Sequence, residues 1–205
     1  MIKLIAMATM LIDHIGAVFF PNVIWLRIIG RISFPLFAWG IAMGYIRTRN
    51  WKRYAIRLFV VGVITQLPYS LLFNNGYLNI CFTLLSGLLA LRVLDEKNMW
   101  ARIFGLISIV VLVHIFEFEY SNYGLFTILV FYYYRDDINL PLYQGILTLG
   151  GIVLYRLHVL QLFSVISSLL LPRLQRYDFR LNRWLQYGFY PVHIVLLLII
   201  RIAAG

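Results

Sequence analysis

An ionisable pair, Asp13-His14, lies inside the first long apolar run of the chain, which extends from Ile2 to Phe20. A charge at the centre of a membrane helix costs on the order of a few kcal/mol, so such residues normally face a protein interior or a water-filled one. Imidazole gains and loses protons near neutral pH, which makes His14 a candidate for proton transfer. Adjacent helical residues point about 100° apart, so Asp13 and His14 should face different partners.

Two arginines are the candidate partners of Asp13. Arg27 and Arg31 lie four residues apart, and therefore on one face of a helix, near the start of the second apolar run. The structural alternative is that Asp13 pairs with one of them only to lock two helices together, and that His14 makes only a helix-helix hydrogen bond.

Of the other polar residues in or near the apolar runs, one is a candidate for the functional site and several are expected to be solvated. His193 lies within the last apolar run, after Tyr190-Pro191, and the proline should bend that helix. A solvated role near the membrane interface is expected for His114, Glu117, Glu119 and His158. No H-E-x-x-H spacing occurs and no two histidines share a helix face, so we expect no metal site. No G-x-S-x-G motif supports a serine nucleophile.

The composition predicts that these residues lie within a membrane. Of 205 residues, 62% are hydrophobic, and apolar runs long enough to be membrane spans follow one another with short breaks. We predict a single integral membrane domain over residues 1–205, multi-pass in the cell membrane. The net charge of +10 does not indicate a nucleic-acid partner, because the basic residues fall in short loops between apolar runs. The single cysteine, Cys81, excludes an internal disulfide.

The predicted fold class is an all-α transmembrane bundle of about nine spans. The expected spans are 2–20, 26–46, 54–73, 78–94, 100–116, 121–134, 141–155, 157–171 and 186–204. Gly150-Gly151 and the segment from Arg156 to His158 leave open whether the seventh and eighth form one bent or re-entrant hairpin.

Charge placement predicts a cytoplasmic N-terminus. Of the 18 Lys and Arg residues, only Arg27, Arg31, Arg156 and Arg201 then fall on the outer side, in agreement with the positive-inside rule. The inner set is Lys3, Arg47, Arg49, Lys52, Arg53, Arg57, Arg92, Lys97, Arg102, Arg135, Arg173, Arg176, Arg180 and Arg183.

Several segments together resemble the TraX family, whose type member is the F-pilin acetylation protein. They are Met10 to Ala17 (MLIDHIGA), Arg27 to Phe37 (RIIGRISFPLF), Thr48 to Asn50, Asn79 to Gly87, Tyr123-Gly124 and Phe189 to His193 (FYPVH). The resemblance covers most of the chain in the same order. Where the family pattern has Asp-Tyr-Gly, this chain has Glu119-Tyr120-Ser121, so an acid is retained and the glycine is not.

The resemblance implies an acetyltransferase that moves an acetyl group from acetyl-CoA to an amine. In that chemistry His14 would be the base and Arg31 would supply donors to the oxyanion, with Asp13 as a supporting charge. The acceptor would be a pilin-like N-terminus, another secreted peptide or a cell-surface amino sugar. Residues expected to contribute to the substrate and cofactor site are Arg27, His193, Tyr190, Glu119, Arg49 and Arg53. The last two belong to inner basic clusters suited to CoA phosphates, although the same clusters also set orientation.

Two other function classes stay open. A proton-coupled transporter or flippase for a small anionic or lipid solute would use Asp13, His14, Arg27 and Arg31 as a midplane substrate site. A structural partner of a larger membrane complex would use the same charges for packing alone.

Overall fold

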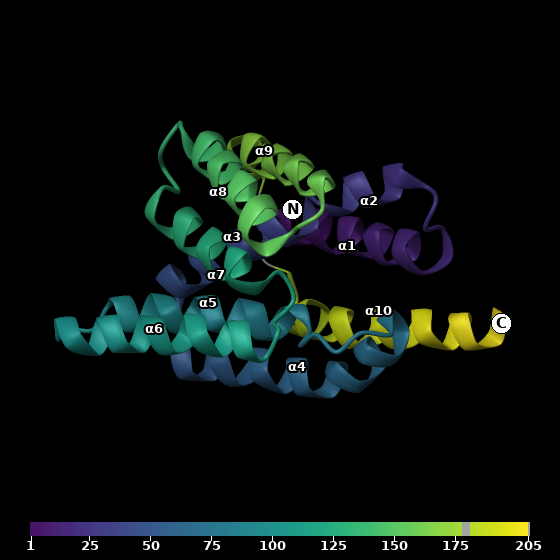
Figure 1. Cartoon of the computed structure of the whole chain (residues 1–205), viewed down its shortest axis with the longest axis horizontal. Helices are drawn as coiled ribbons and strands as arrows, with labels where there is room; N and C mark the ends of the chain where they lie inside the picture. Colours follow the sequence, from purple (N-terminus) through teal and green to yellow (C-terminus); the bar gives the residue numbers. More distant parts are fainter. Residues whose placement is uncertain (178–180, 205) are drawn as a thin grey trace.

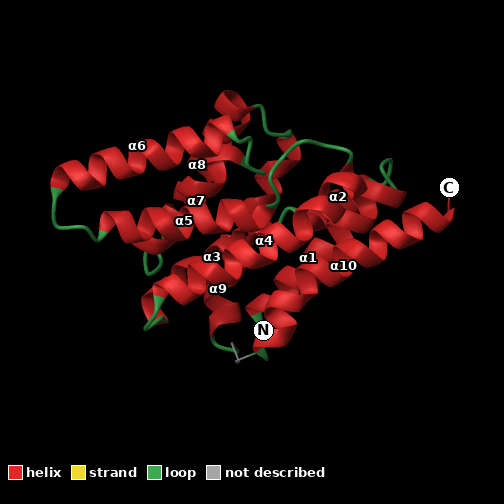
Figure 2. Cartoon of the chain, turned by 90° about the horizontal axis from the view of Figure 1, so that it is seen from below, coloured by secondary structure: helices red, strands yellow, loops and turns green. Residues whose placement is uncertain are grey.

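Every regular element in the described part of the chain is a helix. The structure is a computed structural model and describes residues 1–177 and 181–204; Arg180, assigned above to the inner basic set, lies outside these residues, as does the side chain of Arg183. Figure 2 shows the helices joined by short loops. They are α1 (Ile2–Phe19), α2 (Ile24–Gly30), α3 (Ser33–Arg47), α4 (Trp51–Phe73), α5 (Ile80–Leu94), α6 (Met99–Ile115), α7 (Ser121–Tyr133), α8 (Leu140–Tyr155), the 3-10 helix η1 (Val159–Ser164), α9 (Val165–Gln175) and α10 (Arg183–Ala204).

The helices confirm the predicted all-α fold class of a multi-pass membrane protein. Four helical stretches in the described part are long and apolar enough to cross a bilayer: Ile2–Phe19, Ile24–Arg47, Trp51–Phe73 and Trp184–Ala204. Shorter apolar helices cover Ile80–Leu94, Met99–Ile115, Leu140–Tyr155 and Val159–Gln175. Each predicted span overlaps one of these helices or α7 over most of its length, so the expected spans locate the helices well.

The predicted second span is divided into two helices, α2 and α3. The break falls at Arg31-Ile32, just before Ser33 begins α3. Pro35 is the reason, because a proline has no N–H to donate to the carbonyl of Arg31 one turn earlier. Proline is tolerated in the first turn of a helix, where those N–H groups have no partner within the helix. The short α2 can therefore tilt against α1 independently of α3.

The predicted seventh and eighth spans are two distinct helices. α8 ends at Arg156, whose backbone is left-handed with φ 52°. The His158 side chain then accepts a hydrogen bond from the Leu160 amide at 3.1 Å, which caps η1. η1 continues directly into α9, and α9 packs back against α8. Figure 1 shows these two helices side by side along one edge of the molecule.

The bundle is organised around α3, α5 and α7. α3 packs on α1, α5 and α7, and α4 pairs along its length with α10. In Figure 1 the α4, α5, α6 and α10 helices lie along one side, with α8, α9, α1 and α2 on the other. Trp39 of α3 packs edge-on against Phe131 of α7, with ring centroids 6.0 Å apart, and both side chains are buried.

The helix termini lie at two ends of the bundle. We call these the inner end and the outer end, according to the membrane side that the basic residues predict. At the inner end, Lys3 Nζ donates to Gln186 Oε1 at 2.7 Å, which joins the start of α1 to the start of α10. At the outer end, Leu78 and Phe118 form an isolated β-bridge between the α4–α5 loop and the α6–α7 loop. α1 carries Asp13 and His14 in the half nearer the outer end.

Candidate functional site

Asp13 is the centre of an ion-pair cluster that joins α1 to α2. Arg31 Nη2 donates to both carboxylate oxygens of Asp13, at 2.8 and 2.9 Å, and Arg27 Nη1 lies 2.9 Å from Asp13 Oδ2. Arg27 Nη1 also donates to the Asp13 backbone carbonyl at 2.8 Å. A Cβ at Gly30 would overlap the Asp13 carboxylate, so glycine is what lets the two helices approach here. Asp13 thus pairs with both arginines, and the cluster keeps one unit of positive charge.

His14 faces a different partner, His193 of α10. His14 Nδ1 lies 2.9 Å from His193 Nε2, and both side chains are buried. The divergence of Asp13 and His14 follows from the helical angle between adjacent residues, as expected from the sequence. The pair therefore joins α1 to two different helices, α2 through Asp13 and α10 through His14.

The hydrogen bonds of the two histidines define their tautomers when both rings are neutral. His193 Nδ1 lies 2.8 Å from the backbone carbonyl of Phe189. A carbonyl only accepts, so His193 Nδ1 carries the proton and its Nε2 is an acceptor. His14 Nδ1 must then donate to His193 Nε2. This chain of bonds leaves His14 Nε2 unprotonated and able to accept a proton.

A small polar cavity of about 20 Å³ lies beside His14. That volume has room for about one group the size of a water molecule. Its lining residues are Met10, Asp13, His14, Gly30, Ser33, Phe34, Ile80, Glu119 and Tyr120. We call it the His14 cavity. Arg27 and Arg31 are not among its lining residues, because they lie behind the Asp13 carboxylate that they bind.

Glu119 reaches the His14 cavity from an unusual loop between α6 and α7. Glu117, Tyr120 and Ser121 all have positive φ, at 48°, 64° and 47°, and each such non-glycine residue costs on the order of 1–3 kcal/mol. The Glu119 amide donates to the Leu78 carbonyl at 2.8 Å, and the Thr83 hydroxyl donates to the Glu119 carbonyl. Glu119 is half-buried and Glu117 is exposed. The solvated role expected for both acids therefore fits the placement of Glu117, whereas Glu119 lines the cavity.

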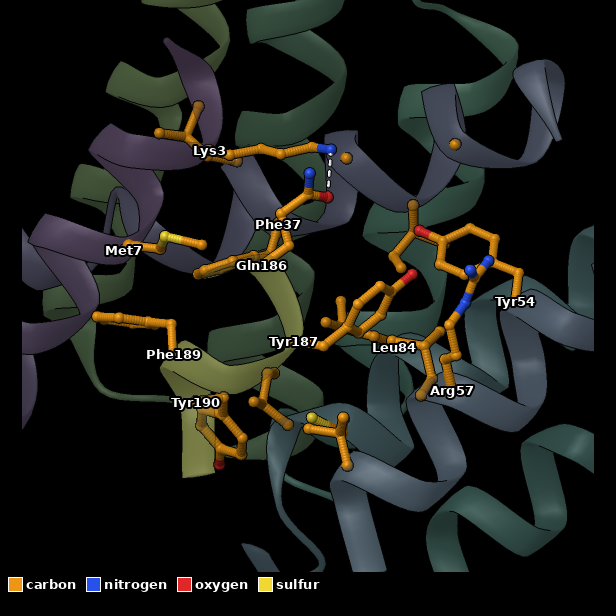
Figure 3. Close-up of a pocket in the computed structure, with 18 of the residues that line it drawn as sticks. Lys3, Met7, Phe37, Tyr54, Arg57, Leu84, Gln186, Tyr187, Phe189 and Tyr190 are labelled. Carbon is orange, nitrogen blue, oxygen red and sulfur yellow. Dashed lines mark hydrogen bonds between the residues drawn. The ribbon is translucent and has the colours of Figure 1, made fainter. Parts of the chain in front are cut away.

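A second cavity, of about 300 Å³, opens at the inner end between α1, α3, α4, α5 and α10. Figure 3 shows Lys3 and Gln186 on one side of it and Tyr54 and Arg57 on the other, with Tyr190 at the bottom of the view, away from Lys3. We call it the inner cavity. Its lining also includes Met10 and Ile80, which line the His14 cavity as well. The two cavities therefore adjoin at these shared side chains.

The basic residues at the inner cavity differ in part from those expected. Arg49 and Arg53, expected to bind the cofactor, are exposed at the same end but do not line the cavity. Arg47 and Arg57 do line it, together with Lys3. Helical spacing could have distinguished them, since Tyr54, Arg57, Leu58 and Val61 share one face of α4.

Tyr190 lies at the deep end of the inner cavity, near the histidine pair. Its ring centroid is 5.5 Å from that of His193, and its buried hydroxyl has no hydrogen-bond partner among the described residues. Pro191 follows inside α10. The Tyr190 hydroxyl is therefore a polar group at the part of the inner cavity that lies near His193.

Sequence reasoning missed a buried polar network behind Arg31. Arg31 Nη1 donates to Gln161 Oε1 at 3.3 Å, and Gln161 Nε2 donates to the Tyr123 hydroxyl at 3.5 Å. The Tyr123 hydroxyl also lies 3.1 Å from Thr148 Oγ1. A glutamine within the apolar segment 159–164 was the available signal. These bonds hold the Arg31 guanidinium through Nη1, while its Nη2 binds Asp13.

The remaining histidines lie away from the site. His114 and His158 are exposed. Within residues 1–177 and 181–204, no group of three or more His, Cys, Asp or Glu side chains is placed to hold a metal ion. The chemistry available at the site is therefore that of a neutral histidine base, two carboxylates and a pair of arginines.

One family model and two curated proteins match the chain. The family model described as "TraX protein" matches residues 1–201. The chain is 28% identical to the "Probable fimbrial assembly protein FimC, serogroup H1" of Dichelobacter nodosus, over 96% of this chain and 92% of that protein. It is also 33% identical to the "Uncharacterized protein RP591" of Rickettsia prowazekii (strain Madrid E), over 37% of this chain and 28% of that protein. No solved structure matches the chain.

Proposed function

Because the chain belongs to the TraX family, we propose that it is a membrane acetyltransferase that moves an acetyl group from acetyl-CoA to an amine. One observation carries this proposal. The inner cavity opens among basic side chains and ends at Met10 and Ile80, which also line the His14 cavity. A thioester on a long flexible arm can enter from the inner end and present its carbonyl beside His14.

The inner cavity suits the donor. Its volume of about 300 Å³ lies at the lower end of the range for small-molecule sites, roughly 300–1,000 Å³. Its walls are largely apolar, as the methylene-rich arm of CoA requires, and Lys3, Arg47 and Arg57 stand where the phosphates would remain. Arg49 and Arg53, exposed at the same end, would extend this basic surface.

His14 supplies the proton transfer. The acceptor nitrogen attacks the acetyl carbonyl, a C–N bond forms and the C–S bond breaks. His14 Nε2 takes the proton that the nitrogen loses, and the departing thiolate of CoA receives it. While His14 is protonated, its Nδ1–H continues to donate to His193 Nε2, which keeps the ring oriented.

The arginines favour the transition state through their charge. Asp13 neutralises only one of the two positive charges of Arg27 and Arg31, so this ion-pair cluster keeps one positive charge near the developing oxyanion. Because Arg31 is already bonded to Asp13 and Gln161, its contribution is electrostatic and the same bonds fix its position.

The proposed acceptor is the N-terminal amine of a pilin-like or fimbrial subunit. The support is the name of the relative from Dichelobacter nodosus, a probable fimbrial assembly protein, together with the family. An amino sugar is the other amine of suitable chemistry, and product analysis separates the two.

The test uses Cys81, the single cysteine of the chain, which is buried and lines the inner cavity. Labelling without ligand is measured first, and direct binding of acetyl-CoA to the purified protein is the second readout. Purified protein in detergent is treated with N-ethylmaleimide, with and without acetyl-CoA. We expect acetyl-CoA to slow labelling of Cys81, and mass spectrometry to detect acetylated tri-alanine or acetylated glucosamine. His14→Ala should keep the protection of Cys81 and lose the transfer.

Two results would overturn the proposal. Unchanged labelling of Cys81 at saturating acetyl-CoA would remove the donor site. Uptake of a solute into liposomes without acetyl-CoA, combined with no acetyl transfer, would instead support the transporter alternative.

A further inference from the structure

Glu119 differs from Asp13 in its charge balance. Asp13 has an arginine nitrogen within 2.9 Å on each side. Glu119 has no basic nitrogen within 4.0 Å among the residues that the structure describes, although both carboxylates line the His14 cavity. An ionised carboxylate in a partly buried site is stabilised by a positive partner. Burial raises the pKa of the Glu119 carboxyl to about 7, although its interactions with Tyr69 and the Ile80 backbone act in the opposite direction. Glu119 is therefore the carboxylate of the His14 cavity without a basic nitrogen in contact, and a cation bound from outside the chain would favour its ionised form.

The fold holds Glu119 in this position at a conformational cost. Three of the five residues from Glu117 to Ser121 have positive φ. Two backbone hydrogen bonds to Leu78, from and to the 117–119 segment, and the hydroxyl of Thr83 fix the loop. Backbone strain of this kind collects at ligand sites, where the surrounding structure enforces a geometry that the segment alone would avoid.

The position of Glu119 also matches the direction from which an acceptor would arrive. Its loop lies at the outer end, between α6 and α7, whereas the inner cavity opens at the opposite end. Donor and acceptor would then approach the His14 cavity from opposite sides.

We propose that Glu119 binds the ammonium group of the acceptor amine and holds it beside His14. This inference rests on the proposed acetyl transfer. The bound –NH3⁺ gives one proton to His14 Nε2 and becomes –NH2, which attacks the acetyl carbonyl. The C–S bond breaks and the thiolate takes the first proton from His14. His14 Nε2, now free again, takes the second proton from the nitrogen as the amide forms and releases it to solvent. Glu119 remains a carboxylate throughout and sets the preference for a cationic acceptor.

The test compares a cationic acceptor with an uncharged one. Tri-alanine has a protonated N-terminal amine at neutral pH, whereas hydroxylamine is largely uncharged there and does not need an ammonium site. The variant is Glu119→Gln, which keeps the size of the side chain and one acceptor oxygen and removes the negative charge. Glu117→Gln is the matched control, because Glu117 lies in the same loop with its side chain exposed.

We expect Glu119→Gln to raise KM for tri-alanine about tenfold or more, the scale of losing one charged partner, and to leave hydroxylamine acetylation within about twofold. Glu117→Gln should match the wild type with both acceptors. Protection of Cys81 by acetyl-CoA should be the same in all three proteins.

The outcomes separate this inference from the proposed function. Equal losses with tri-alanine and hydroxylamine in Glu119→Gln would make Glu119 structural, and no loss with either would also overturn the ammonium site. If wild-type protein protects Cys81 and acetylates hydroxylamine but not tri-alanine, the ammonium site is wrong and the donor site stands. If acetyl-CoA does not protect Cys81, the proposed function itself fails.

Discussion

His14 and His193 lie 179 residues apart in the chain, yet the ring nitrogens His14 Nδ1 and His193 Nε2 are 2.9 Å apart. The contact joins the first helix to the last, and the Phe189 carbonyl fixes the tautomers of both rings. A base oriented by a second group is a recurring arrangement for proton transfer. It orients the His14 ring and, with both rings neutral, leaves its Nε2 as the proton acceptor.

The histidine pair predicts unequal effects of two alanine substitutions. His14→Ala removes the base and should lower kcat by about 10²- to 10⁴-fold. His193→Ala leaves the base and removes its orientation, so a smaller loss of roughly tenfold to 100-fold is expected. Because the two act as a unit, the double variant should be no slower than His14→Ala. Steady-state rates of acetyl transfer measure this, and a double variant with multiplied losses would show that the residues act independently.

The inner cavity predicts a steric block at Gly40. Gly40 lines the cavity, and a Cβ there would meet nothing within 4 Å. Gly40→Leu should therefore fold, occupy the path of the acyl arm and raise KM for acetyl-CoA about tenfold or more, the cost of losing roughly 1.4 kcal/mol of binding.

Gly145→Leu is the control for this block. Gly145 lies in α8, away from the cavity, and its Cβ would also have open space. Protection of Cys81 by acetyl-CoA, titrated in both variants, is the measurement. An unchanged titration in Gly40→Leu would exclude the inner cavity as the donor path.

The ion-pair cluster predicts a difference between its members in thermal unfolding. Asp13→Asn leaves two arginines without their carboxylate and should destabilise the protein by up to about 3–5 kcal/mol, the cost of breaking a buried pair. Arg27→Gln should cost less, since Arg31 still binds Asp13 through two hydrogen bonds and Arg27 is the more exposed partner. Equal melting temperatures for the two variants would contradict the central role of Asp13.

The α6–α7 loop predicts a stabilising substitution. Ser121 has φ 47°, a conformation that costs other residues roughly 1–2 kcal/mol relative to glycine. Ser121→Gly should stabilise the protein by about 0.5–1 kcal/mol after the larger loss of chain entropy by glycine. Ser108→Gly, at an exposed position inside α6, should destabilise by a similar amount. Thermal unfolding of both in detergent checks the opposite signs, and a lower melting temperature for Ser121→Gly would refute the strain at this position.

The backbone strain at Ser121 has a counterpart in the sequence, although the sequence alone did not predict it. The family pattern has a glycine where this chain has Ser121, and the structure shows why a glycine suits the position. We expected Glu119 to be solvated, whereas in the structure it is half-buried and lines the His14 cavity. The α6–α7 loop is the reason. The exposure of Glu119 depends on a loop that is bent back by three left-handed residues and a bridge to Leu78, and no local pattern encodes that bend.

The amino-acid sequence by itself determined the membrane class, the helix positions, the family and the separation of Asp13 from His14. These follow from hydropathy, motif order and the fixed angle between neighbouring helical residues, which are local properties of the chain. Only the tertiary structure decided that His14 meets His193, that Asp13 binds both arginines, and that Arg47 and Arg57 rather than Arg49 and Arg53 line the inner cavity. Such contacts depend on how helices rotate and pack against one another, and that packing is a property of the whole bundle.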